Sequence, residues 1–193
     1  MNLAVALYLA ALAGPLPYYP PGQCPETGAE RALRMATIAL AIDAETERAD
    51  EWAPGWTRED WAWAAYAKTW AESRRFAVEV HDGRKRGDNG KSVCVGQIWG
   101  GGDVLVGTDL AATRRCYHEV FRHMLIHRER CRVGAASPTA VATIFAGYGT
   151  GHSCNPDFVS RHSGRFARRR ATAWDRLRSH GAHGSRFAQG AGN

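Results

Sequence analysis

The sequence lacks an apolar run long enough to cross a bilayer as a helix, for which about 20 residues are needed. The run from Leu3 to Ala13 has about the length of a signal-peptide hydrophobic region, and residues 11–13 fit a small-x-small cleavage site. No lysine or arginine precedes this run, so the basic start typical of a signal peptide is missing. Residues 1–14 are therefore expected to be either a signal peptide or an N-terminal apolar helix.

An intact nucleotide-binding motif and internal repeats are also absent from the sequence. The stretch GRKRGDNGKS, residues 83–92, ends like a phosphate-binding loop. Lys85, however, occupies the position where that motif requires its first glycine, whose small size lets the backbone wrap the phosphates. The stretch is therefore excluded as a nucleotide site.

No complete set of metal ligands is evident. His118 and Glu119 resemble the start of a zinc-protease motif, but the next histidine follows after five residues instead of four and leaves the helix face. A second set shares one helix face at i, i+4 and i+8, without an evident fourth ligand: His123, His127 and Cys131. The sequence thus predicts no metal and no cofactor.

Acidic residues are too few to balance the basic ones. Against 19 Asp+Glu there are 25 Lys+Arg, which gives a formal charge of +6 and favours an anionic partner. The arginines gather near the C-terminus: Arg161, Arg165, Arg168, Arg169, Arg170, Arg176 and Arg178. They would bind an anionic wall polymer or a membrane surface, with DNA phosphates and a merely solvated helix face as the alternatives.

The five cysteines are an odd set: Cys24, Cys94, Cys116, Cys131 and Cys154. The last four suit two disulfides in an oxidising compartment, with Cys24 left over, while five free thiols in a reducing cytosol are the alternative. Cys116 and Cys131 cannot pair with each other, because one continuous helix would hold them about 22 Å apart.

Helical periodicity dominates the chain after a proline-rich linker over 15–27. A helix is predicted over 26–49, with a buried face that comprises Leu33, Ala36, Leu40 and Ala44 and is widened by Ile38 and Ile42. Further helix starts are predicted at Thr57, with Asp60 completing a capping box, at Asp109, and at Ser137 followed by Pro138.

Two short strands are predicted in the irregular middle of the chain, over 76–80 and 93–99. A last helix is predicted over 165–179 and a disordered tail over 181–193. The sequence therefore predicts a mainly α (α+β) fold with a small β-element, in one folded domain that spans residues 28–180.

A single carboxylate stands out in TWAESRRF, residues 69–76. Glu72 falls in the last turn of a predicted amphipathic helix, beside Trp70. The helix dipole disfavours a negative charge there and apolar rings withhold water, so both effects are expected to raise the pKa of the Glu72 carboxyl. Such a group is suited to hold and deliver a proton near neutral pH.

Four motifs follow one another along the chain: Glu72-Ser73, GDNG at 87–90, VGQI at 95–98 and AGYGTG at 146–151. Their order and spacing resemble the lysozyme-like superfamily, in particular soluble-type lytic transglycosylases and goose-type lysozymes. The similarity covers roughly residues 33–174. It implies a lysozyme-like helical domain in which a β-hairpin lies beside the active-site cleft.

The resemblance also implies roles for individual residues. Glu72 matches the catalytic acid, Ser73 the neighbour that orders it, and Asp88 the aspartate that positions the attacking water in goose-type lysozymes. Ordinary turn chemistry is the alternative for Asp88. The remaining positions match substrate-binding segments or the end of the last motif: Gly96, Gln97, Ile98, Tyr148, Gly149 and Gly151.

The chain departs from the family pattern at two places. Gly149 stands where the family has asparagine, which removes an amide that could bind glycan. Val95 and Gly96 stand near the usual Leu-Met pair, so the register of this loop differs from that of its relatives.

Taken together, these features predict a peptidoglycan-cleaving glycosidase that acts on the MurNAc-β-1,4-GlcNAc bond with Glu72 as general acid. The expected protein is monomeric, secreted or in the cell envelope, of bacterial, phage or toxin origin, and without a specific nucleic-acid partner. The alternative is a non-catalytic cationic protein that binds wall polymer or nucleic acid. Hydrolysis and anhydro-forming transglycosylation both stay open.

Overall fold

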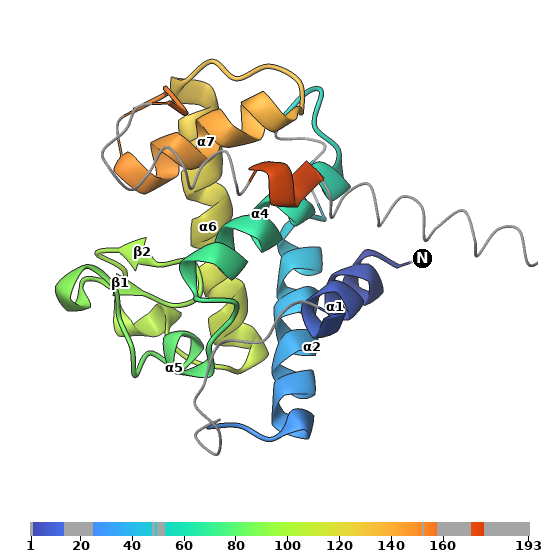
Figure 1. Ribbon diagram of the computed structural model, residues 1–193, viewed down its shortest axis with the longest axis vertical. Helices are drawn as coiled ribbons and strands as arrows, with labels where there is room; N and C mark the ends of the chain where they lie inside the picture. Colours follow the sequence, from blue (N-terminus) through green and yellow to red (C-terminus); the bar gives the residue numbers. More distant parts are fainter. Residues whose placement is uncertain are drawn as a thin grey trace, which may run out of the picture.

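The computed structural model describes residues 2–13, 25–47, 49, 53–151, 153–157 and 171–175. These residues form a mainly helical structure with a small two-stranded antiparallel sheet (Figure 1), so the coarse fold class is confirmed. The α-helices are α1 (Leu3–Ala13), α2 (Gly28–Glu45), α4 (Arg58–Glu72), α5 (Val78–His81), α6 (Leu110–Arg130) and α7 (Pro138–Thr150). Short 3-10 helices η1 (Asp88–Gly90) and η2 (Asp103–Leu105) flank the strands β1 (Ser92–Val93) and β2 (Ile98–Trp99).

The helices begin where capping side chains satisfy their free N–H groups. Thr57 and Asp60 form the predicted capping box at the start of α4. Asp109 accepts a hydrogen bond from the Ala112 N–H at the start of α6, and Ser137 caps α7 ahead of Pro138. The three predicted helix starts are confirmed.

Helix α4 lies at the centre of the described structure, in front of the long helices α2 and α6 and below α7 in the view of Figure 1. It is buried along its whole middle, from Asp60 to Thr69. The side chain of Trp61 is fully enclosed, and the Trp174 indole N–H donates to the Asp60 carbonyl at 3.0 Å. A helix that is buried on every side carries its few polar groups at high cost, so each of them needs a partner.

Helix α2 buries only part of the face that was predicted. Leu33 is 72% exposed and Leu40 is 49% exposed, whereas Met35, Ile38 and Ile42 are buried. Apolar residues occur on more than one side of this helix, and the larger Met35–Ile38–Ile42 side packs towards α1 and α6. The predicted burial was therefore wrong for Leu33 and Leu40 and is confirmed for Ile38 and Ile42.

The two predicted strands also need correction. Residues 78–81 form one helical turn, α5, instead of a strand, and its buried His81 Nε2 hydrogen-bonds the Thr113 hydroxyl at 3.0 Å. The segment 93–99 reverses direction, because Cys94 and Gln97 both adopt positive φ angles. It thus contributes to both strands of a hairpin, in which Ser92 pairs with Trp99 and Val93 with Ile98.

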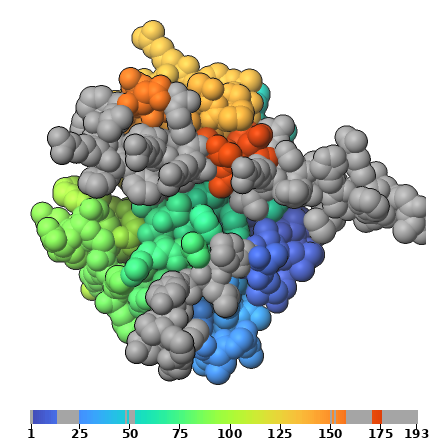
Figure 2. Space-filling model, viewed as in Figure 1, coloured from blue at the N-terminus to red at the C-terminus, as the bar shows by residue number. Residues whose placement is uncertain are grey.

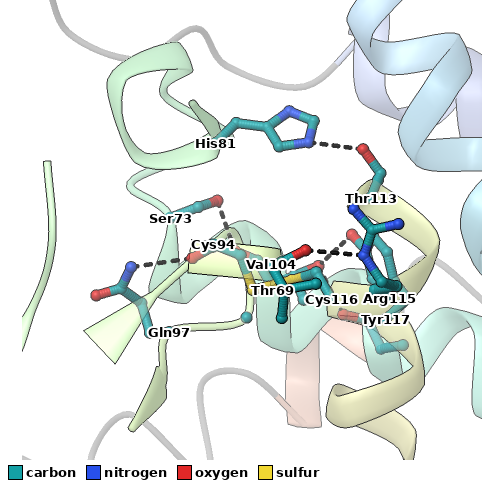
Figure 3. Close-up of a disulfide and its surroundings, with 12 residues drawn as sticks. Thr69, Ser73, His81, Cys94, Gln97, Val104, Thr113, Arg115, Cys116 and Tyr117 are labelled. Carbon is teal, nitrogen blue, oxygen red and sulfur yellow. Dashed lines mark hydrogen bonds between the residues drawn. A yellow bond between two sulfur atoms is a disulfide. The ribbon is translucent and has the colours of Figure 1, made fainter. Parts of the chain in front are cut away.

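Two disulfides join distant segments: Cys94–Cys116 and Cys131–Cys154. Cys116 and Cys131 do not pair with each other, as predicted. The first bridge ties the hairpin to α6 (Figure 3). Two disulfides indicate an oxidising, extracytoplasmic environment. Among the described residues, every helix is too short or too polar to cross a membrane.

Several sequence predictions fall outside the described residues. These are most of the linker at 15–27 with Cys24, the arginines after 160, most of the helix over 165–179, and the tail at 181–193. Residues 3–13 are helical and pack against α2, with Leu7 fully buried. The removal of residues 1–14 as a signal peptide stays a prediction.

Replacement of both Cys94 and Cys116 by serine is expected to lower the free energy of unfolding by about 3 kcal/mol, since the bridge closes a loop with a sequence separation of 22. Urea unfolding monitored by circular dichroism measures this loss. The Cys131→Ser/Cys154→Ser variant opens a loop of nearly the same size, with a separation of 23, and serves as the matched comparison. A loss below about 1 kcal/mol for the first pair would contradict this role of the bridge.

Candidate active site

Glu72 is the last residue of α4, and Ser73 orders the end of that helix. The Ser73 hydroxyl donates to the Thr69 carbonyl at 2.6 Å and accepts from the Phe76 N–H at 2.9 Å. Figure 3 shows Ser73 close to the buried Cys94–Cys116 bridge. Since Ser73 is fully buried, its hydroxyl serves the backbone beside Glu72 and presents no surface to a ligand.

The chain directly after Glu72 is strained. Arg74, Arg75 and Phe76 have φ angles of 54°, 67° and 58°, a left-handed turn made without glycine. Each such residue costs roughly 1–2 kcal/mol. Hydrogen bonds from the Arg75 N–H to the Trp70 carbonyl and from the Ala77 N–H to the Ser73 carbonyl offset this cost, as does the burial of the Phe76 ring. Strain of this kind is concentrated at functional sites.

Glu72 is held by a lysine that lies one helical turn earlier. Lys68 Nζ donates to Glu72 Oε1 at 2.5 Å, with a Lys68 side chain that is 0% exposed and a Glu72 side chain that is 22% exposed. The ammonium favours the ionised form of the carboxyl, opposite to the effect expected from the sequence on the grounds of helix dipole and neighbouring apolar rings. The i, i+4 spacing of a basic and an acidic residue was the sequence signal that could have revealed this pair.

The same ammonium lies against helix α7. Lys68 Nζ is 4.1 Å from the centroid of the Tyr148 ring, a cation–π distance. The Tyr148 hydroxyl in turn donates to the Gly96 carbonyl at 2.9 Å. Three of the predicted site residues, Glu72, Tyr148 and Gly96, are therefore joined through Lys68 in one chain of contacts, although they come from α4, α7 and the hairpin turn.

Three other residues predicted to contact substrate differ in how much of their surface is exposed: Gln97, Ile98 and Gly149. The Gln97 side chain amide donates to the Cys94 carbonyl at 3.0 Å and spans its own turn (Figure 3). Ile98 is buried in the core. Gly149 is exposed on α7, with open space where a side chain would stand. Of these three predicted contacts, only Gln97 and Gly149 have surface that a ligand can reach.

Asp88 lies on a different element from Glu72. It is exposed in η1, has a positive φ of 49°, and accepts a hydrogen bond from the Ser92 hydroxyl. This contact orients the carboxylate on the loop that leads into β1. Figure 2 shows the green segment that contains this loop at the surface, beside the blue-green end of α4.

Helix α6 contributes two histidines that sequence reasoning considered only as zinc ligands. Burial lowers the pKa of His127 to about 4, with help from the charges of His123, Arg130 and Lys68. Burial also lowers the pKa of His123, whose ring centroid is 5.7 Å from that of Tyr148. Both imidazoles are therefore neutral at neutral pH.

The third member of the zinc set is not free to bind metal as a thiolate, because Cys131 is bonded to Cys154. Within the ranges that the structure describes, no group of three or more histidine, cysteine, aspartate or glutamate side chains is placed to hold a metal ion.

Comparisons of the chain with models of known protein families, with curated proteins and with solved structures give no match. The candidate site accordingly depends on the motifs and on the geometry of the residues themselves.

Gly96→Ala is expected to destabilise the fold by roughly 1–3 kcal/mol, because an added Cβ would lie 2.4 Å from Val120 Cγ2 in α6. It should also displace the carbonyl that receives the Tyr148 hydroxyl. Gly149→Ala is the matched control: it meets nothing within 4 Å and should stabilise α7 by up to about 1 kcal/mol. Thermal unfolding compares the two, and an equal effect of both variants would refute the close packing at Gly96.

Proposed function

We propose that this protein cleaves the MurNAc-β-1,4-GlcNAc bond of peptidoglycan, with Glu72 as the general acid. The observation that carries the proposal is the arrangement at the end of α4. There, a partly exposed carboxylate is anchored by a buried lysine to the aromatic ring of Tyr148, whose hydroxyl binds the hairpin turn at Gly96.

The chemistry of glycoside cleavage fits a carboxyl in this position. The leaving oxygen must receive a proton as positive charge develops on the sugar ring, and a fixed carboxyl delivers that proton most effectively. Glu72 is 22% exposed, which leaves it accessible to a ligand while the rest of its side chain is enclosed. The strained turn after it and the buried Ser73 hydroxyl keep its backbone fixed.

The family resemblance supports the same activity. The order of the motifs is that of soluble-type lytic transglycosylases and goose-type lysozymes, and a mainly helical structure with one small hairpin agrees with a lysozyme-like fold at the level of elements. The two disulfides are consistent with an activity outside the cytoplasm, where peptidoglycan is found. In this proposal the glycan strand binds across the end of α4 and the hairpin.

Glu72→Gln is expected to reduce the release of soluble muropeptides from purified peptidoglycan by about 10²–10⁴-fold, the usual contribution of a general acid. The amide keeps the shape of the side chain and removes its proton-donating carboxyl. Glu129→Gln, an exposed glutamate near the end of α6, is the matched control and should keep full activity.

Retained activity in Glu72→Gln would rule out this role for Glu72. If the wild-type protein releases nothing but binds peptidoglycan or shifts duplex DNA in a salt-dependent way, the alternative of a non-catalytic cationic binding protein is correct.

The role proposed for Asp88 concerns the product. With a second carboxylate that positions water, hydrolysis yields reducing muropeptides; without it, the C6 hydroxyl of the sugar attacks and an anhydro product forms. Asp88→Asn is therefore expected to raise the anhydro share relative to wild type, measured by mass spectrometry as the loss of one water. An identical product ratio in the two proteins would remove Asp88 from the mechanism.

A further inference from the structure

Lys68 is the most deeply buried of the lysine, arginine, aspartate and glutamate residues that the structure describes. It is 0% exposed and it carries a charge, whereas an apolar side chain of similar volume would fill the same space without the desolvation penalty. Its ammonium is held by the Glu72 carboxylate at 2.5 Å and by the face of the Tyr148 ring at 4.1 Å. An apolar replacement would preserve the packing but not the contact with the candidate acid.

We propose that Lys68 is a positioning residue of this site, whose buried ammonium fixes the Glu72 carboxyl and confines glycan cleavage to acidic pH. This inference rests on the function proposed above and extends it to the regulation of the same site. It depends on the ion pair, on the complete burial of its cation, and on the ring that lies against it.

The position of the ammonium is fixed from two elements. On α4, the one-turn spacing places Nζ next to the Glu72 carboxylate. On α7, the Tyr148 ring lies against Nζ and is itself held by the bond from its hydroxyl to the Gly96 carbonyl. Displacement of the hairpin turn would therefore move Tyr148, and through it Lys68 and the acid.

The charges around this pair determine the direction of the pH effect. On α6, His123 and His127 have lowered pKa values and are neutral at neutral pH, so Lys68 supplies positive charge beside Glu72. After α4, the Arg75 guanidinium lies over the Trp70 ring, 5.9 Å from its centroid. On α7, the neighbouring group is the aromatic ring of Tyr148.

A general acid works only while it is protonated. A cation beside it stabilises the carboxylate, so the proton is lost at a lower pH and activity declines at a lower pH. Removal of the cation has the opposite effect. The alkaline limb of the pH–rate profile must then move to higher pH.

Lys68→Met is the direct test, because methionine approximates the length of the lysine stem without its charge. The alkaline limb of kcat for muropeptide release is expected to move up by about one pH unit or more relative to wild type. Lys68→Arg keeps the charge and should keep the limb near its wild-type position, even if its larger head lowers kcat. An unmoved limb in Lys68→Met, or one that moves to lower pH, would overturn the proposal.

A second measurement separates this inference from the proposed function, because it needs no activity. Carbon-13 NMR follows the titration of glutamate carboxyls, and the signal of Glu72 is the one lost in Glu72→Gln. Its midpoint should lie at lower pH in wild type than in Lys68→Met. If wild type cleaves no peptidoglycan while these midpoints differ as expected, the proposed function is wrong but the electrostatic coupling of Lys68 to Glu72 is confirmed. Equal midpoints in the two proteins would refute that coupling.

Should Lys68→Met fail to fold, the titration of Lys68 itself decides the question. In wild type the ammonium has an anionic neighbour, and in Glu72→Gln this neighbour is neutral. Nitrogen-15 NMR of the lysine side chains should therefore show a Lys68 midpoint at lower pH in Glu72→Gln than in wild type. An unchanged midpoint would overturn the inference.

Discussion

The ion pair between Lys68 and Glu72 is the constraint on which the site depends. Helix α4 is enclosed along its middle, so an ammonium on that helix must find its partners inside the protein. It finds the carboxylate one turn later and the ring of Tyr148 on α7. The end of α4, the end of α7 and the hairpin turn are thereby brought together around one buried charge. A glycan-cleaving acid at this point would have both its place and its ionisation governed by that charge.

The surrounding structure fixes the positions of these elements relative to one another. The Cys94–Cys116 bridge joins the hairpin turn to α6 (Figure 3). Gly96 packs so closely on Val120 of the same helix that an added Cβ would lie 2.4 Å from Val120 Cγ2. From the second residue after Glu72, three consecutive residues without glycine, 74–76, adopt left-handed backbone angles. Further positive φ angles occur at Asp88, Asn89 and Gln97, in the motifs that the resemblance singles out, and at Cys94, one residue before the third of them. The strain in this part of the chain thus lies next to the groups proposed to act on substrate.

Local signals in the sequence predicted where three of the helices begin and which cysteines cannot pair. The starts of α4, α6 and α7 followed from capping residues, and helical rise excluded a bridge between Cys116 and Cys131. The predictions that were wrong concern features that depend on tertiary packing. Leu33 and Leu40 are exposed because α1 and α6 cover another side of α2, and residues 78–81 turn into a helix after the left-handed segment. The cation beside Glu72 was readable in the sequence as an i, i+4 pair with Lys68, which an argument from helix dipole and burial alone left out. The contact of Lys68 with Tyr148 joins residues far apart in sequence and could not be predicted.

The most direct test of the account is mass spectrometry of the soluble material that the wild-type protein releases from purified peptidoglycan, followed from acidic to alkaline pH. The account predicts disaccharide-peptides cut at the MurNAc–GlcNAc bond, abundant at acidic pH and declining as the solution becomes alkaline. Absence of such fragments at every pH, or release that increases steadily into the alkaline range, would contradict it.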